Sequence, residues 1–216
     1  MRLVVLPGVL RPPSDCWMLA DVMRTRGLAS HGTVLDVFSG SGALAVAAAL
    51  EGAACVAAVD VSRRAVLNAR LNARLNGVRV RSLRGDLFVP VRGKRYDLIL
   101  ANPPYVPSPD DELPTHGAAR AWEGGVDGRL LLDRLCVQAA DHLTAGGSVL
   151  IVHSSLAGEE ATVRGLRDSG LEVEVAARRR GPLGPIASAR AELLEQRGLL
   201  QPGIREEELL VIQGRG

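Results

Sequence analysis

The chain has 216 residues and carries 26 basic against 24 acidic side chains, which leaves a net charge of +2. This near balance produces no strong field for a nucleic acid or an anionic membrane, so neither partner is predicted. The apolar fraction of 47% and the charged fraction of 23% are ordinary for a globular protein, and the length fits one large domain.

Cysteine and histidine spacing narrows the class of protein further. Cys16, Cys55 and Cys136 lie far apart and match neither a zinc-ligand spacing nor a disulfide framework, and the four histidines have no metal-like spacing. The opening apolar run is broken by Pro7 and Gly8, and no apolar run of about 18 residues follows it. We therefore expect no metal site, no membrane segment and a cytoplasmic protein.

Apolar periodicity predicts strands that alternate with helices along the chain. A lead-in helix begins at about residue 15, and a long loop rich in proline and glycine covers 102–126. The expected strands are 33–38, 54–60, 78–83, 96–101, 147–153, 171–179 and 207–213. The expected helices after the lead-in are 43–52, 62–77, 127–143, 158–170 and 186–198.

This alternation predicts an α/β fold with a mostly parallel seven-stranded sheet and helices on both faces. The last two strands alternate apolar and charged residues less cleanly, so an antiparallel strand is expected at one edge. Because composition does not shift and no repeat occurs, residues 1–216 are expected to form a single domain. Within it, 1–30 hold the lead-in helix, 33–153 the ligand-binding core, and 154–216 the edge strands and a helix.

The segment LDVFSGSGAL (35–44) lies at the first strand-to-helix turn, where a doubly wound sheet binds its ligand. A turn that merely needs glycine is the alternative explanation. Carboxylates near the loop favour a ligand site instead. Asp36 lies on the preceding strand, Asp60 ends the second strand and can accept both hydroxyls of a ribose, and Asp86 follows the third.

A dinucleotide is the competing ligand for such a loop. Its pyrophosphate cradle is commonly G-x-G-x-x-G, but Ala45 stands three places after Gly42. Carboxylates near the loop also favour a cationic ligand without phosphate, and S-adenosylmethionine (SAM) fits this description. We expect Asp60 at the ribose, Asp86 and Leu87 around the adenine, and Asp36 near the amino-acid tail. The predicted cofactor-binding residues are Cys16, Asp36, Phe38, Ser39, Gly40, Ser41, Gly42, Asp60, Val61, Asp86, Leu87 and Asn102.

The segment ILANPPYVPSP (99–109) ends a buried strand on a rigid polar tip. A planar amino group is a weak nucleophile because its lone pair is delocalised, and two acceptors that grip both of its N–H groups can turn and polarise it. The Asn102 side-chain oxygen and the Pro103 carbonyl are the predicted pair. Pro104 stiffens the backbone, and Tyr105 can stack on a planar group. A stiff loop start without chemistry is the alternative.

Two groups of residues follow from this interpretation. The predicted catalytic residues are Asn102, Pro103, Pro104 and Tyr105. The predicted substrate contacts are Asn102, Pro103 and Tyr105, joined by His116 and Trp122 from the long loop that follows the strand. A local hydrogen bond for His116 and a core anchor for Trp122 are the plainer alternatives.

The chain resembles the HemK/PrmC family of class I SAM-dependent methyltransferases. DVFSGSGAL, AVDVS, GDLF and ILANPPYV match the family's ordered motifs over roughly 33–153, and THGAARAWEGGVDGRLLLDRL (115–135) is similar to its short eukaryotic and archaeal branch. The resemblance implies a Rossmann-like fold and N5-methylation of a glutamine in a protein such as a release factor, at a Gly-Gly-Gln loop. PPSDCWMLADVM (12–23) resembles that branch's cofactor-touching lead-in, with Cys16 in the place of a hydroxyl residue.

The sequence departs from the family pattern at two places. The N-terminal helical domain of the bacterial release-factor enzymes is missing from this sequence, and Phe38 stands where the family usually has glycine. The resemblance also implies a small zinc-binding activator subunit, which in the short branch shields an apolar sheet edge. The strand VRVRSL is polar enough to stand without such a cover, so the need for a partner stays open.

Three other functions remain as alternatives. An N6-adenine or other nucleic-acid amine methyltransferase shares the Asn-Pro-Pro-Tyr motif but usually adds a basic face or a recognition domain. A small-molecule N-methyltransferase is the second alternative. An inactive binding scaffold is the third, and the intact NPPY and SGSG motifs argue against it.

Overall fold

Seven strands form one sheet in the computed structural model, which describes residues 1–216. The strands are β1 (Thr33–Val37), β2 (Cys55–Asp60), β3 (Arg81–Arg84), β4 (Tyr96–Ala101), β5 (Leu143–Ser154), β6 (Glu172–Pro182) and β7 (Glu206–Arg215). Their order across the sheet is β3-β2-β1-β4-β5-β7-β6. The first five strands in this order, β3, β2, β1, β4 and β5, pair in parallel. β7 lies between β5 and β6 and is antiparallel to both. The predicted mostly parallel sheet with antiparallel pairing at one edge is confirmed.

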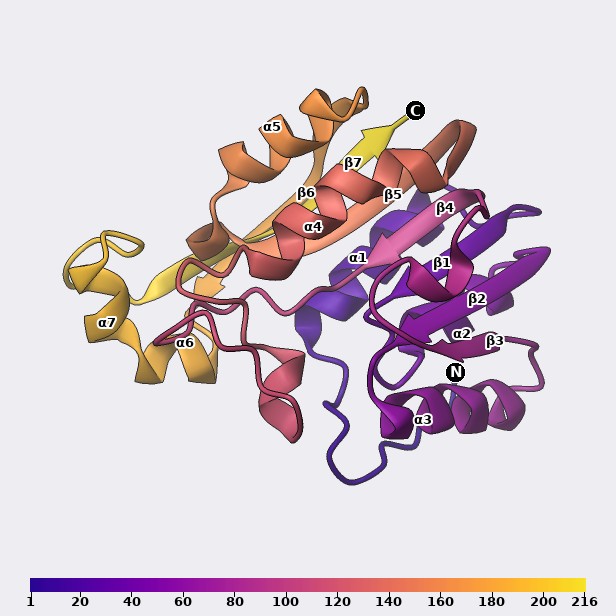
Figure 1. Cartoon of the computed structure of the whole chain (residues 1–216), viewed down its shortest axis with the longest axis horizontal. Coiled ribbons are helices and arrows are strands. Elements are labelled where there is room, and N and C mark those ends of the chain that lie inside the picture. The colour runs from indigo at the N-terminus through magenta and orange to yellow at the C-terminus, as the bar shows by residue number, and fades with distance from the viewer.

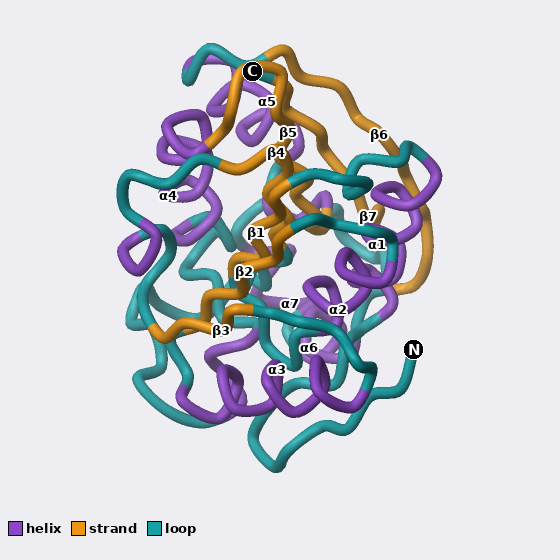
Figure 2. Tube along the Cα trace, turned by 90° about the vertical axis from the view of Figure 1, so that its right-hand side faces the viewer, coloured by secondary structure: helices purple, strands orange, loops and turns teal.

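Helices cover both faces of this sheet (Figures 1 and 2). One face carries α1 (Ser14–Thr25), α2 (Ala43–Leu50) and α3 (Arg63–Leu75), and the other carries α4 (Leu130–Ala139) and α5 (Glu159–Asp168). Two short helices, α6 (Pro185–Ala189) and α7 (Ala191–Gln196), lie beyond the end of β6 and β7. No helix has both the length and the apolar character needed to cross a membrane.

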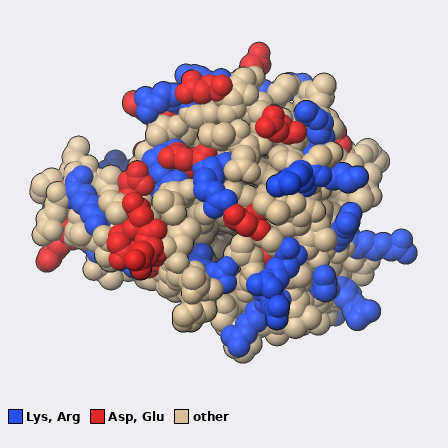
Figure 3. All heavy atoms as spheres, viewed as in Figure 1, with Lys and Arg blue, Asp and Glu red and all other residues tan.

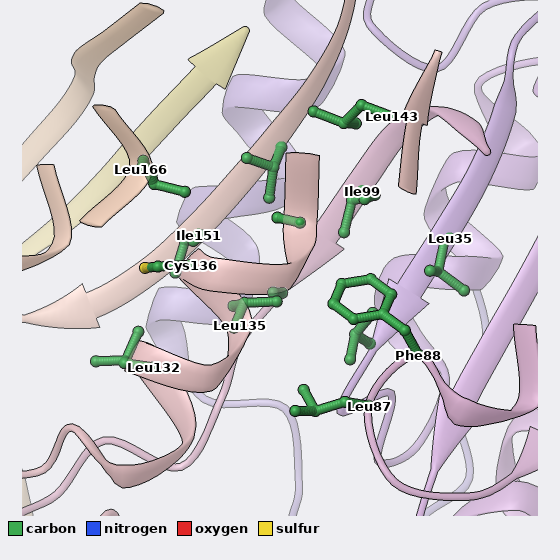
Figure 4. Packing of buried hydrophobic residues seen from close by; sticks show 14 of the residues in the cluster. Leu35, Leu87, Phe88, Ile99, Leu132, Leu135, Cys136, Leu143, Ile151 and Leu166 are labelled. Carbon is green, nitrogen blue, oxygen red and sulfur yellow. The ribbon is translucent and has the colours of Figure 1, made fainter. Parts of the chain in front are cut away.

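The core divides into two apolar clusters because successive strand residues point to opposite faces. Leu35 and Ile99 face α4 and pack with its Leu132 and Leu135 (Figure 4). Their neighbours along the strands, such as Val34, pack instead with α1 and α2. One cluster packs against each face of the sheet. Together they hold in place the strand ends from which the loops of the site emerge.

Local sequence explains where α3 starts and stops. The Ser62 hydroxyl accepts a hydrogen bond from the N–H of Ala65 at 3.4 Å and caps the first turn. Gly77 follows the last turn with a φ of +68°, a conformation that glycine adopts without strain. This helix therefore occupies almost the whole of the predicted range 62–77.

Several predicted elements differ in their bounds: the expected helix at 127–143 is the shorter α4, the expected strand at 147–153 is the longer β5, and two further differences have a local cause. The expected helix at 186–198 is two helices separated at Arg190, whose φ of −109° and ψ of 12° interrupt the helical path. This break turns α7 so that Leu194 joins an apolar cluster with Leu183 and Leu200. The expected strand at 78–83 begins only at Arg81, the first residue that pairs with β2.

Candidate active site

A cavity of about 460 Å³ lies at the carboxyl ends of β1, β2 and β4. This is the edge at which open α/β sheets bind their ligands, and the volume suits a small organic molecule. The predicted cofactor-side residues that line it are Cys16, Phe38, Ser39, Gly40, Ser41, Asp60, Val61, Asp86 and Leu87. The predicted acceptor-side residues that line it are Asn102, Pro103, Pro104, Tyr105 and Trp122.

The glycine loop turns sharply between β1 and α2. Phe38, Gly40 and Gly42 all have positive φ angles, of 62°, 52° and 77°. A Cβ atom on Gly42 would lie 2.6 Å from Cβ and 2.7 Å from Cα of Ala69, so only glycine lets the loop pack against α3. Gly42 itself lies outside the cavity lining, and its contribution is to hold the loop in place.

Phe38 is the strained member of this loop, because a bulky residue at positive φ costs roughly 1–2 kcal/mol. We predict that Phe38→Gly is more stable than Phe38→Ala by about 1 kcal/mol, since both lose the ring but only glycine relieves the backbone. Urea unfolding of the two variants measures this difference. Equal midpoints would show that the loop relaxes out of the left-handed region.

Asp36 lies behind the loop and outside the cavity lining. Its Oδ2 accepts a hydrogen bond from the N–H of Ala45 at 3.0 Å, while its buried Oδ1 has no partner. Burial raises the pKa of the Asp36 carboxyl to about 8, because a carboxylate without water is costly. A cation in the neighbouring cavity would favour the ionised form.

Asp60 ends β2 and is held for contact with a ligand. Its two carboxylate oxygens accept hydrogen bonds from the N–H of Gly40 at 2.9 Å and of Ser62 at 2.8 Å. Burial raises the pKa of the Asp60 carboxyl, and these two N–H groups oppose the rise. Each oxygen keeps acceptor capacity toward the cavity, as two neighbouring ribose hydroxyls require.

Asp86 and Leu87 follow β3 at the same edge of the sheet. The Asp86 carboxylate pairs with Arg134 of α4 at 2.5 Å, with both side chains nearly half exposed. Leu87 is buried and has a φ of 44°, which turns the chain toward Phe88 in the core. The side of the cavity predicted to hold the adenine thus combines an apolar wall with a salt-bridged rim.

The Asn-Pro-Pro-Tyr tip follows directly from Ala101, the last residue of β4. The Tyr105 hydroxyl donates to Oδ2 of Asp15, in the first turn of α1, at 2.5 Å. Burial and the Asp15 carboxylate hold the pKa of Tyr105 well above its ordinary value. The phenol therefore stays neutral, and its ring is anchored as a fixed wall beside Asn102.

The remaining predicted residues are placed as follows. Cys16 is buried in the wall, and burial together with the Asp36 and Asp15 carboxylates raises the pKa of its thiol, so it stays neutral. Trp122 lines the cavity, and its indole N–H donates to Glu123 at 3.2 Å. His116 is exposed and hydrogen-bonds to Thr115, away from the cavity lining.

Sequence reasoning missed the residues before the predicted lead-in at 12–23 as part of this site. Residues 8–10, 12 and 13 line the cavity, and residues 2–6 run alongside α3 in Figure 1. Three asparagines spaced four apart bind the backbone of residues 2, 4 and 6: Asn68 and Asn72 on α3, and Asn76 directly after it. We call residues 1–13 the strap. The four-residue spacing of asparagines was the signal that could have revealed it.

Asn72 joins the strap to the glycine loop. Its carboxamide accepts from the N–H of Val4 at 2.8 Å and donates to the carbonyls of Val4 and Ser41, each at 2.9 Å. We predict that Asn72→Ala weakens SAM binding by about tenfold or more, because each lost hydrogen bond is worth about 1 kcal/mol. Calorimetric titration measures this, with Asn76→Ala, which frees only residue 2, as the control.

A similar loss of SAM affinity in both asparagine variants would instead show that release of the strap causes the loss, without a contribution from the Asn72 bond to the glycine loop. Unchanged affinity in Asn72→Ala would show that the strap and the loop are uncoupled.

The cavity suits a cationic nucleoside on structural grounds. Ser39 lines it and has a buried hydroxyl without a partner, which a polar ligand atom would satisfy. Asp60 offers acceptors to a diol, and the buried Asp36 carboxyl lies behind the loop. These features fit SAM and provide no cradle for a pyrophosphate.

Comparison with known proteins places the chain among methyltransferases. The family model described as "Methyltransferase small domain" matches residues 16–116. A putative protein N5-glutamine methyltransferase of Methanocaldococcus jannaschii is 37% identical over 182 residues, covering 84% of this chain and 90% of that protein. A release factor glutamine methyltransferase of Gloeobacter violaceus is 38% identical over 173 residues, covering 76% of this chain. The match spans only 59% of that longer relative.

A solved methyltransferase structure has the same fold as this chain. The Mtq2–Trm112 complex of E. cuniculi, responsible for methylation of the eRF1 translation termination factor, has a chain that superposes with a TM-score of 0.67 at 20% identity. The match covers 96% of this chain and 98% of that one. At this identity the likeness concerns the fold, and it confirms the Rossmann-like architecture expected from the sequence.

Proposed function

Because the chain belongs to the protein N5-glutamine methyltransferase family, we propose that it methylates the side-chain amide nitrogen of a glutamine in a protein, with SAM as donor and a peptide-release factor as target. One observation carries the proposal. The Asn102–Tyr105 tip, the glycine loop and Asp60 line the same cavity. A donor site and an acceptor site for a planar nitrogen therefore lie side by side.

The cofactor half of the cavity has a defined set of contacts in this proposal. SAM supplies an electrophilic methyl group carried on a sulfonium cation. Asp60 holds the ribose hydroxyls, Leu87 covers the adenine, and Ser39 meets a polar atom of the cofactor with its unpartnered hydroxyl. Cys16 contributes a neutral apolar surface.

The acceptor half works by orientation. The Asn102 side-chain oxygen and the Pro103 carbonyl each accept one N–H of the glutamine carboxamide. Holding both N–H groups turns the amide so that its nitrogen lone pair faces the methyl donor, which is catalysis by positioning. Tyr105, held by its hydrogen bond to Asp15, forms one wall of the acceptor half of the cavity. No side-chain base is needed, because the proton leaves the nitrogen after the transfer.

The surface charge favours a protein over a nucleic acid as substrate. Basic and acidic side chains share the face shown in Figure 3, with basic groups gathered at the lower right and acidic groups at the left. With a net charge of +2, the chain has little of the positive excess from which phosphate binding derives its affinity. A release factor would also place the protein in the cytoplasm, where translation occurs.

The chain is proposed to act as one domain without an obligatory partner. All seven strands belong to one sheet, which supports a single methyltransferase domain over 1–216. The open edge strand β3 carries exposed Arg81 and Arg84, and charged side chains on an edge discourage pairing with another chain. The small activator subunit that the family resemblance implies is therefore tested as an addition, and the Mtq2–Trm112 complex supports including it.

The test offers labelled SAM with three acceptors: a release factor with a Gly-Gly-Gln loop, DNA and tRNA. The proposal predicts label on the factor and none on either nucleic acid, without an activator. Label on DNA or tRNA alone would overturn the choice of substrate. Label on the factor only after a Trm112-type protein is added would overturn the partner-free part while retaining the reaction.

A further inference from the structure

Residues 183–200, which connect β6 to β7, have no role in the site as described so far. They form α6 and α7 and build their own apolar cluster from Leu183, Ala187, Ala191, Leu194 and Leu200, completed by Leu156. Figure 1 shows both helices beside the loop that follows β4. Gly184, Pro185, Ile186 and Ala187 line the cavity. This segment therefore borders the acceptor side of the site.

Arg190, at the break between the two helices, reaches across to that loop. Its guanidinium binds the Glu123 carboxylate through two nitrogens, at 2.5 and 2.9 Å, and donates to the carbonyl of Pro107 at 2.9 Å. The side chains of Arg190 and Glu123 are only 21% and 11% exposed. A paired fork of this kind fixes direction as well as distance.

Arg197, which directly follows α7, binds the same loop at other points. It donates to the carbonyls of Ser108 at 2.6 Å, Pro109 at 2.7 Å and Val126 at 2.9 Å. The two arginines thus bind both arms of the loop, 106–109 and 122–126, which also pair with each other at Val106 and Glu123. Six hydrogen bonds from these two arginines therefore hold the loop against residues 183–200.

The contacts lead from Arg190 to the cavity wall. Glu123, which Arg190 binds, accepts the indole N–H of Trp122 at 3.2 Å, and Trp122 and Ile186 of α6 both line the cavity. Pro107, whose carbonyl also binds Arg190, lines it too. Moving Arg190 would therefore displace two residues of the acceptor wall while leaving Asp60 and the glycine loop untouched.

We infer that Arg190 is a positioning residue for the acceptor, acting through Glu123 to hold Trp122, and that α6 supplies a second wall that restricts the substrate to a narrow peptide loop. This inference rests on the proposed protein substrate for its second half only. The first half, the placement of Trp122 by Arg190, concerns the chain itself and can be measured without any substrate.

The test compares Arg190→Met and Arg190→Lys in a Trp17→Phe background, where Trp122 is the sole tryptophan. Arg190→Met should shift Trp122 emission to the red and increase its quenching by acrylamide. Arg190→Lys keeps the charge without the fork and should give an intermediate result. Arg205→Ala is the control, because Arg205 pairs only with Glu195 and its neighbours at the far end of α7.

Steady-state kinetics with the protein acceptor as the varied substrate form the second part of the test. Arg190→Met should lower kcat/KM for the acceptor by about ten- to a hundredfold, mainly through KM, because a small misplacement of a binding wall is costly. The Kd for SAM should stay within about twofold, since the cofactor contacts are separate. Arg190→Lys should recover part of the loss.

Unchanged Trp122 emission and quenching in both Arg190 variants would overturn the inference, and would leave α6 and α7 a purely stabilising role. If Arg190→Met does not fold, Arg190→Lys decides by the same readouts. Should no release factor be methylated by the wild-type chain, the substrate proposal fails while the fluorescence arm still decides the role of Arg190.

Discussion

Asn102→Ala is expected to lower kcat by about two to three orders of magnitude, the cost of removing one preorganised hydrogen-bonding group from the reacting atoms. The residue follows the last residue of β4 and lines the cavity, where its oxygen is proposed to hold one N–H of the acceptor amide. Alanine removes this acceptor and leaves Asp60 and the glycine loop in place. Turnover with labelled SAM and calorimetric titration of SAM separate the two effects.

Asn102→Asp is the matched comparison, because it keeps an acceptor oxygen in the same position while adding charge. It should retain more activity than alanine, and the SAM affinity of both variants should stay near that of the wild type. An alanine variant that turns over at the wild-type rate would show that the side-chain oxygen does not grip the acceptor.

Gly42→Ala should lower the free energy of unfolding by about 2–4 kcal/mol, from overpacking against α3 and from the left-handed backbone. The added Cβ would meet Ala69 at 2.6 and 2.7 Å, and one of these contacts is with Cα, which cannot swing away. Urea denaturation measures the loss. SAM affinity should fall as well, because the loop must shift to make room.

Gly77→Ala is the control for backbone strain alone. Its φ of 68° is close to the 77° of Gly42, but no atom lies within 4 Å of a Cβ placed there. We expect a loss of about 1 kcal/mol for this variant. If the two alanine variants lose the same stability, the close packing of the loop on α3 contributes nothing.

The sequence predicted the parts of the molecule that depend on local patterns. Asp60 and Asn102 were expected at strand ends, and both line the cavity because adjacent parallel strands end at one edge. The seven strands were recognised from short apolar runs or from alternating apolar and polar residues, and their mostly parallel arrangement followed from the helices between them.

Contacts between distant segments were not predictable in this way. Asp15 and Tyr105 are 90 residues apart, and Asn76 lies 74 residues from Arg2. No local period records such a pair, because each depends on the finished arrangement of the layers. Arg190 shows the same limit. The sequence around it has a continuous helical pattern, and the break between α6 and α7 at this residue is explained only by its ion pair with the buried carboxylate of Glu123.

Tandem mass spectrometry of the methylated protein tests the central claim most directly. The wild-type chain, SAM and a release factor with a Gly-Gly-Gln loop are incubated together, and fragment ions locate the added methyl group. The account predicts one methyl group on the side-chain amide nitrogen of that glutamine, and none when the glutamine is replaced by glutamate. A methyl group on a lysine, an arginine or a carboxylate would contradict the account, because none of these groups is the carboxamide whose two N–H groups Asn102 and Pro103 are proposed to hold.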